Sequence, residues 1–121
     1  MERSTAITII ARAVHEAIRA YQGALGEEEA PRWDQAGWMQ DSTREAVEFA
    51  LKNPTPGAQH EAWLATKRRQ GWSHGAVKDA ERKTHPSIVP FDDLNESEQR
   101  KDAILIAVAQ SIGRVLEVTD R

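Results

Sequence analysis

The sequence predicts a mainly α-helical fold of about four helices with one small two-stranded β-ribbon. Three observations support this. Apolar residues recur at helical spacing near both ends of the chain, capping patterns mark helix starts between them, and a stretch broken by Gly75, Pro86 and Pro90 has neither helical nor long strand periodicity. With 121 residues, the chain is expected to form one domain over 1–121.

The first predicted helix covers about Thr5 to Gln22, and Gly23 ends it. Its apolar stripe consists of Ile7, Ile10, Val14, Ile18 and Tyr21, with Ala11 and Ala17 beside it. An acidic loop follows from Glu27 to Gln40 and contains Trp33 and Trp38. Tryptophans in a polar connection usually bury their rings, so we expect both to pin this loop to the core.

Two helices are predicted in the middle of the chain. One should begin at position 41 or 42, because Ser42 and Glu45 have the spacing of a capping box, and Pro54 stops it. Its buried residues should be Val47, Ala50 and Leu51. Thr55 followed by Pro56 has the pattern of an N-cap and a first helical residue, which predicts a further helix to about position 70.

The remaining elements are a ribbon and a last helix. The short runs Trp72–His74 and Ser87–Val89 are expected to pair as an antiparallel ribbon. The last helix should begin at Asn95, with Glu98 completing a capping-box-like pair, and run to about Val118. Its predicted stripe is Ile104, Val108, Ile112 and Val115, flanked by Leu105 and Leu116.

The composition limits the classes of function. A hydrophobic fraction of 40% is ordinary for a globular protein, and the absence of cysteine excludes disulfides, thiolate metal sites and cysteine nucleophiles. The net charge of −3 argues against a general nucleic-acid binder. The N-terminal apolar run, Ala6 to Ala11, is too short for a signal peptide, and no stretch approaches a membrane span, so a cytoplasmic protein without membrane association is expected.

The segment Gln59–Pro90 differs from the rest of the chain. It contains two of the four tryptophans and three of the four histidines. Its six cationic residues, against three acidic ones, are Lys67, Arg68, Arg69, Lys78, Arg82 and Lys83. Aromatic faces beside positive charge are typical of sites for planar, anionic ligands, so this segment is the candidate recognition site.

Within the segment, His60, Trp63 and Lys67 lie on one face of the predicted third helix, at spacing i, i+3 and i+7. A nucleobase could stack on the indole while the two flanking side chains contact phosphate. Equally, Trp63 could belong to the core, with His60 and Lys67 at its solvent boundary. Spacing alone leaves both interpretations open.

The loop after this helix adds Lys78, which follows Gly75–Val77, a turn of small residues that lets backbone amides approach a ligand. Lys78 could instead form a local ion pair with Asp79. His85, before a proline, is expected to make a structural hydrogen bond. The secondary candidates for ligand contact are Trp72, His74 and Arg82.

Patterns that would indicate catalysis are weak. The spacing of His60, His74 and His85 matches no compact metal-ligand motif, and His60-Glu61 lacks the second histidine of a zinc-protease helix. No glycine-rich phosphate loop is present either. We therefore expect no enzymatic activity, metal or cofactor.

Several motifs occur together in this chain. They are His60-Glu61-Ala62-Trp63, Gly71-Trp72, Gly75-Ala76-Val77-Lys78-Asp79, His85-Pro86 and Val89-Pro90-Phe91. Their order and spacing resemble the RyR domain, the repeat first described in ryanodine receptors, over about residues 7–112. The chain departs from the family pattern at His74, Ala76 and Phe91, where the family has tyrosine, proline and tyrosine, and at Arg82, where it has lysine.

This resemblance implies a mostly helical, non-catalytic domain that binds or sequesters an adenine nucleotide or a nucleotide-derived signal. With one repeat, the chain resembles the isolated copies in bacterial and phage proteins, for which a sensing or sequestering role is expected. Carried over by position, the resemblance implies ligand contacts at His60, Trp63, Lys67 and Lys78. Because the family's repeats come in pairs, it also implies a homodimer. The alternative is a protein-interaction or assembly domain whose tryptophan-bearing basic patch docks an acidic partner.

Overall fold

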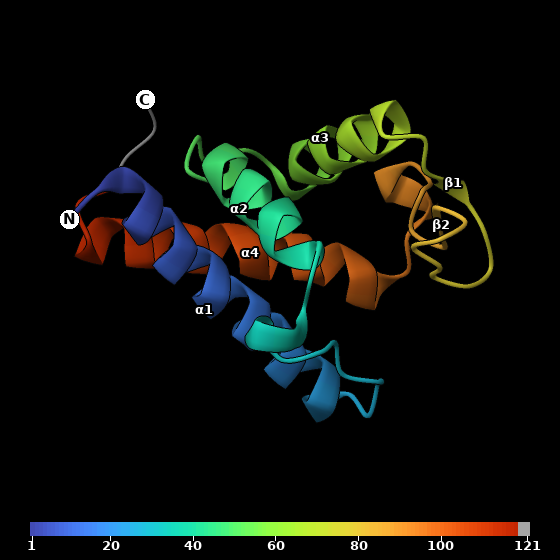
Figure 1. The fold of residues 1–121 in the computed structure, drawn as a ribbon, viewed down its shortest axis with the longest axis horizontal. Helices are drawn as coiled ribbons and strands as arrows, with labels where there is room; N and C mark the ends of the chain where they lie inside the picture. Colours follow the sequence, from blue (N-terminus) through green and yellow to red (C-terminus); the bar gives the residue numbers. More distant parts are fainter. Residues whose placement is uncertain (119–121) are drawn as a thin grey trace.

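Helices α1, α2 and α4 form the centre of the fold, and α3 lies against α2 and α4 with the β-ribbon beyond its end (Figure 1). The computed structural model describes residues 1–118. Its elements are α1 (Arg3–Ala24), η1 (Trp33–Gln35), α2 (Met39–Ala50), α3 (Pro56–Arg69), β1 (Ser73–His74), β2 (Thr84–His85), η2 (Phe91–Asp93) and α4 (Glu96–Val115), where η marks a 3₁₀ turn. The predicted mainly α-helical class with a small ribbon is confirmed.

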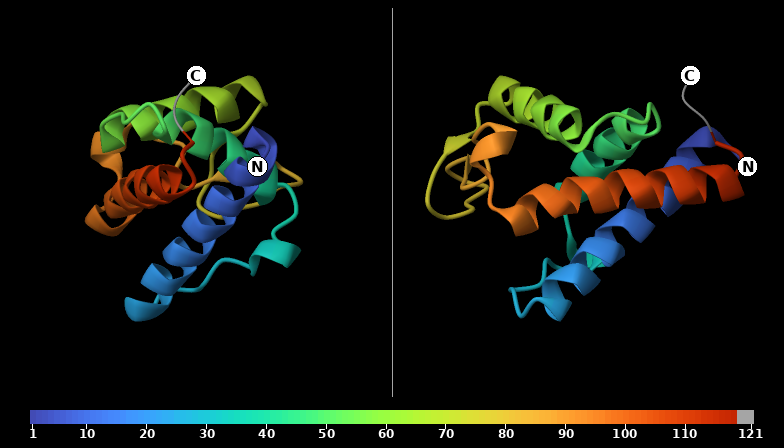
Figure 2. Two further views of the ribbon diagram at one scale, coloured as in Figure 1. Left: turned by 90° about the vertical axis from the view of Figure 1, so that its left-hand side faces the viewer. Right: turned by 180° about the vertical axis from the view of Figure 1, so that it is seen from behind.

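The main core lies where α1 crosses α4 and α2 packs beside them (Figure 2). Its buried members are Ile7, Ile10, Ala11, Val14, Trp33, Val47, Ala50, Leu51, Ile106 and Ala109. Trp33 therefore pins the loop after α1 to the core, as expected. The same expectation is wrong for Trp38, which is 38% exposed and lies at the N-terminus of α2.

Helix α2 begins earlier than its capping pattern predicted. Gly37, with a φ of +57°, turns the chain, and Met39 N–H already donates to the carbonyl of Ala36. Ser42 and Glu45 consequently lie inside the helix, and no side chain caps its first turn. The capping-box prediction is wrong here because backbone turns upstream start the helix first.

The caps predicted for the two later helices are present. Thr55 Oγ1 accepts from Ala58 N–H at 3.1 Å, and Asn95 Oδ1 accepts from Glu98 N–H at 2.9 Å. The carboxylate of Glu98, however, accepts from Lys101 Nζ at 2.6 Å. The pair thus forms one half of a capping box, and the Glu98 carboxylate instead pairs with Lys101 one turn along the same helix.

Helix α4 packs much of its predicted stripe against the core, since Val108 and Ile112, with the flanking Leu105 and Leu116, are partly buried there. Its most buried positions, however, are Ile106, Ala109 and Gly113. Val115, predicted to be apolar core, is 77% exposed. The reason is that the helix ends there, with Leu116 as its C-cap and Glu117 at positive φ, so the chain turns Leu116 and Val118 onto the core instead.

The ribbon pairs β1 with β2 in parallel, not antiparallel as expected, and the second strand is 84–85, not 87–89. Ser73 N–H donates to the carbonyl of Lys83, and Gly75 N–H to that of His85. A tight loop, closed by two hydrogen bonds between Asp79 and Thr84, has already reversed the chain before β2 starts. The chain has also bent back once after β1, around residues 76–77, so the two reversals together leave β2 running in the same direction as β1.

Gly75 is a packing position in this ribbon. A Cβ atom added to it would lie 2.6 Å from Thr84 Cβ, closer than real Cβ contacts. The predicted close approach at the Gly75–Val77 turn thus brings one protein strand against another, since the missing side chain admits β2.

We expect Gly75→Ala to destabilise the protein by about 1–3 kcal/mol, because the added methyl overlaps Thr84 in a packed strand pair. Gly57→Ala is the matched control, since its methyl would meet Phe91 only at an ordinary 3.6 Å and alanine favours a helix. Thermal denaturation of both variants measures the difference. Equal melting temperatures would show that β2 moves aside at little cost.

Candidate functional site

Helix α3 directs its side chains to two different surroundings, a cleft beside α2 and the protein interior. The side chains of Gln59, Ala62, Trp63, Thr66 and Arg69, at i, i+3, i+4, i+7 and i+10, turn toward α2. His60, Leu64 and Lys67 are buried on another side of the helix. Because Thr55 and Pro56 fix where the helix starts, they also fix which residues fall on each face.

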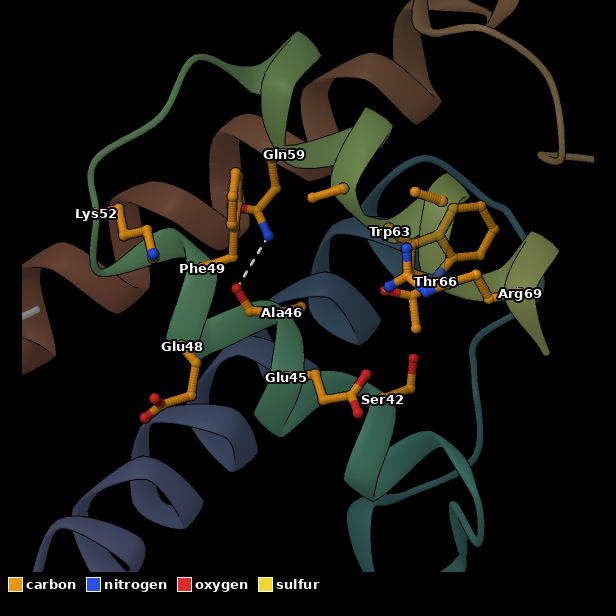
Figure 3. Close-up of a pocket in the computed structure, with 12 residues that line it drawn as sticks. Ser42, Glu45, Ala46, Glu48, Phe49, Lys52, Gln59, Trp63, Thr66 and Arg69 are labelled. Carbon is orange, nitrogen blue, oxygen red and sulfur yellow. Dashed lines mark hydrogen bonds between the residues drawn. The ribbon is translucent and has the colours of Figure 1, made fainter. Parts of the chain in front are cut away.

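The first face lines a cleft of about 650 Å³ between α2 and α3, referred to below as the α2–α3 cleft (Figure 3). Its lining from α2 and the turn after it consists of Ser42, Glu45, Ala46, Glu48, Phe49 and Lys52. Phe49 and Gln59 lie side by side toward one end, while Trp63, Thr66 and Arg69 lie toward the other, across from Glu45 and Ser42 (Figure 3). The cleft therefore has an amide, a ring and the cation of Lys52 toward one end and the cation of Arg69 toward the other (Figure 3).

A second hollow of about 450 Å³ adjoins the cleft and shares Ser42 and Glu45 with it. We call it the lysine hollow. Its other lining residues are Trp38, Asp41, Lys67, Gln70, Trp72, Ala80 and Lys83. A ligand longer than one ring system could thus extend from the cleft into the hollow.

Lys67 places a buried cation in the wall of the hollow. The residue is 4% exposed, and its ammonium lies 4.6 Å from the centre of the Trp38 ring and 5.5 Å from that of Trp72. Within residues 1–118 it forms no ion pair, and its one hydrogen bond runs to Gln70 Oε1 at 3.4 Å. Burial lowers the pKa of Lys67, Glu45 opposes the shift and Lys78 adds to it.

Lys78 lies close to the same tryptophan. Its ammonium is 5.3 Å from the Trp38 ring centre and 3.3 Å from Met39 Sδ. The residue is exposed as a whole, but loss of water around the ammonium lowers its pKa. Asp79 pairs with Arg82 at 3.8 Å instead of with Lys78, so the local ion pair considered for Lys78 is not formed.

The structure therefore brings Lys67 and Lys78 together on Trp38, a residue that sequence reasoning had assigned to the core. The spacing of Trp38 gave no indication of this role, since the residue precedes its helix and its partners come 29 and 40 positions later. A tryptophan between two lysines is a common setting for cation–π contacts.

Trp63 connects the cleft to the interior. Its ring is partly buried, lies 5.5 Å from the His60 ring and meets the His85 ring edge-on at 5.4 Å. One part of the indole lines the α2–α3 cleft. One interpretation placed Trp63 at a ligand site and the other placed it in the core. The structure shows Trp63 lining the cleft and also packed against the small core around Leu64 and Trp72.

His60 is a structural clamp in this arrangement. It is 4% exposed, its Nε2 atom lies 2.7 Å from the carbonyl oxygen of Val89, and its Nδ1 atom faces Asp102 Oδ2 at 3.9 Å. It thereby joins α3 to the segment before η2 and to α4. His60 lines neither the cleft nor the hollow.

The secondary candidates separate into scaffold and surface. Trp72 is 8% exposed and forms a small second core with Leu64 and Ile88, although its edge lines the lysine hollow. His74 and Arg82 are exposed and line neither the cleft nor the hollow.

His85 and Asp102 are buried groups with opposite pKa shifts. His85 Nδ1 accepts from Ser87 N–H at 2.9 Å, which confirms the expected structural hydrogen bond. Burial, followed by the charges of Lys78 and Lys67, lowers the pKa of His85 to about 4. Burial, followed by the charge of Glu98, raises the pKa of Asp102 to about 7.

Over residues 1–118, no three histidine or carboxylate residues cluster as metal ligands. Among the helices described, none has both the length and the apolar character to cross a bilayer.

One family of protein domains, described as the RyR domain, has a model that matches residues 42–115. The match covers 74 of the 121 residues, from the first turns of α2 to the end of α4. Every residue that lines the α2–α3 cleft falls inside this range, whereas Trp38 and Asp41 of the lysine hollow precede it.

The two shifted groups should give stability opposite dependences on pH. The folded state holds the Asp102 proton up to about pH 7 while the unfolded chain releases it near 3.8, so this group lowers stability as pH rises between these values. The folded state protonates His85 only near pH 4 against 6.5 when unfolded, so stability from this group rises over that interval. At about 1.4 kcal/mol per pKa unit, these contributions are at most about 4.5 kcal/mol for Asp102 and about 3.5 kcal/mol for His85.

We therefore expect Asp102→Asn to raise the free energy of unfolding at pH 8. In this variant only the His85 effect remains, so stability should fall steeply as the pH drops below 6.5. His85→Asn, which keeps an acceptor for Ser87 N–H, should leave a decline from pH 4 to 7. Urea unfolding between pH 4 and 8 measures both curves. Asp92→Asn and His74→Asn, at exposed positions, are the controls and should keep the wild-type profile. Parallel curves for all five proteins would contradict the assignment.

Proposed function

This chain is a member of the RyR domain family, and we propose that it acts as a non-catalytic module that binds a nucleotide or nucleotide-derived ligand between α2 and α3. The observation that supports this most directly is the junction of an aromatic-walled cleft with a hollow that holds a buried ammonium without a carboxylate partner.

The order of side chains along α3 suggests how such a ligand would lie. From the N-terminal end, the cleft presents Gln59, then the Trp63 ring, then Arg69, and Lys67 continues into the lysine hollow. A planar base on Trp63 would therefore direct its phosphates toward the C-terminal end of the helix. The carbonyl dipoles there disfavour an anion, and the three cations of the last turn, Lys67, Arg68 and Arg69, offset them.

A phosphate would also resolve the position of Lys67. Burying an ammonium without a counter-ion costs free energy, and cation–π contact with two indoles returns only part of it. Lys78 adds a second ammonium near the same ring, and their mutual repulsion contributes to the lowered pKa of Lys67. An anionic group within reach of both would replace repulsion by attraction.

A second function, docking of an acidic protein partner, is favoured by one surface feature. Val77 is 71% exposed at the tip of the ribbon loop, and Arg82 and Lys83 are exposed in the same loop. This surface is distinct from the cleft. A partner that binds there should be lost in Val77→Asp and retained in the presence of saturating nucleotide.

We expect calorimetry to detect ATP binding to the wild-type protein and a loss of about tenfold or more in Trp63→Leu, because base–indole stacking contributes roughly 1–3 kcal/mol. Lys67→Met should lose affinity similarly while keeping or raising the melting temperature, since it removes a buried charge. Arg12→Gln is the control, because Arg12 is exposed on α1, away from this helix end, and lines neither the cleft nor the hollow. Absence of binding by ATP, ADP-ribose, NAD and cyclic dinucleotides at millimolar concentration would refute the proposal.

Glu45 provides a test of opposite sign. Its carboxylate lines both the cleft and the hollow and interacts with the charge of Lys67. Glu45→Gln should strengthen ATP binding several-fold at low ionic strength and less at high salt, because a screened repulsion is removed. Glu28→Gln, in the exposed loop after α1, should change nothing. Weaker binding in Glu45→Gln would indicate that the ligand offers Glu45 a hydrogen-bond donor or a cation.

A further inference from the structure

Gln59 contains a buried acceptor that the fold leaves unused. The residue is 2% exposed, and its Nε2 atom donates to the carbonyl of Ala46 on α2 at 2.9 Å. Its Oε1 atom is buried and has no hydrogen-bond partner within residues 1–118. Buried side-chain oxygens are nearly always hydrogen-bonded, so such an exception calls for an explanation.

The orientation of this amide is set by its other half. Rotating the amide by 180° would give Nε2 to the vacant side but would place Oε1 against the Ala46 carbonyl, where two acceptors repel. Gln59 can therefore offer an incoming group only an acceptor. Across residues 1–118, Tyr21 Oη is in the same unpaired state, but Tyr21 lines neither the cleft nor the hollow.

The amide lies where one edge of a bound ring would reach. Gln59 precedes Trp63 by four residues, which is about one helical turn or 6 Å along α3. Ala62 lies between them in the cleft lining and contributes only a methyl group. A bicyclic ring that stacks on Trp63 can thus extend over Ala62 as far as Gln59, with its phosphate-bearing side toward Arg69.

Phe49 is the cleft-lining ring next to this amide (Figure 3). Its ring stands beside the Gln59 amide at this end of the cleft and is only partly buried (Figure 3). Rotation of the Phe49 side chain toward solvent would open Oε1 to the cleft without disturbing the bond to Ala46.

We propose that Gln59 Oε1 selects the ligand by accepting a hydrogen bond from an amino group on its ring, so that the site prefers amino-bearing bases over those with a carbonyl or hydrogen at that edge. The proposal rests on the nucleotide-binding function proposed above. The Gln59 amide would act here only as an acceptor, because its nitrogen already donates to the Ala46 carbonyl.

Two matched ligand pairs test this by calorimetry. ATP and purine riboside 5′-triphosphate differ only in the 6-amino group, and CTP and UTP place an amino group or a carbonyl at the same ring position. We expect the wild-type protein to bind the amino-bearing member of at least one pair about tenfold more tightly, which corresponds to about 1.4 kcal/mol. Gln59→Leu and Gln59→Met, of similar size, should bring that ratio close to one.

The outcomes separate selection by Gln59 from its alternatives. If Gln59 is structural only, both members of a pair lose affinity equally in the variants and the wild-type ratio persists, which overturns the proposal. Equal affinities within both pairs for the wild type overturn it too, while leaving the nucleotide-binding function in place. If none of the four triphosphates binds, selection by Gln59 is overturned, and binding of ADP-ribose, NAD or a cyclic dinucleotide then decides whether the nucleotide-binding function fails as well. Circular dichroism of the two variants confirms that they are folded.

Discussion

The structure depends on how α3 buries three polar side chains. Gln59, His60 and Lys67 are each at most 4% exposed, and each must find a partner inside the protein or leave its polar group unsatisfied. Gln59 donates to the backbone of α2, and His60 contacts the Val89 carbonyl and faces Asp102 on α4. These polar contacts, together with Leu64, fix the rotation of α3. They thereby direct the Trp63 face into the space beside α2.

The same constraint separates polar groups that the fold satisfies from those that it leaves without a full set of partners. His60 has hydrogen-bonding or charged groups on both sides of its ring, so it is complete without a ligand. Lys67 has two indole faces and a long hydrogen bond to Gln70, and Gln59 has one half of its amide unpaired. The incompletely satisfied groups, on Gln59 and Lys67, are the ones that line the cleft and the hollow. A ligand with an anionic group at one end and a donor at the other would complete both.

Much of the fold could be predicted because it rests on local chemistry. The caps at Thr55 and Asn95 and the stripe of α1 need only neighbouring residues to be recognised, and all are present. The wrong predictions are those in which the path of the backbone decides, not the spacing of apolar side chains. Parallel pairing of the ribbon accompanies the Asp79–Thr84 closure, and the exposure of Val115 follows from the end of α4. Neither can be recognised from hydrophobic periodicity.

The candidate site shows the same division more sharply. Helical spacing placed His60, Trp63 and Lys67 together, but periodicity says nothing about which side of a helix meets protein and which meets solvent. Neighbouring residues on α3 have in fact opposite roles, since Gln59 and Trp63 line the cleft while His60 and Leu64 pack inward. A motif such as His-x-x-Trp therefore combines an inward-packed residue and a cleft-lining residue within one turn. Matching such a motif identifies the family, whereas any ligand must be inferred from the residues around it, including Trp38 and Gln59, which lie outside the motif.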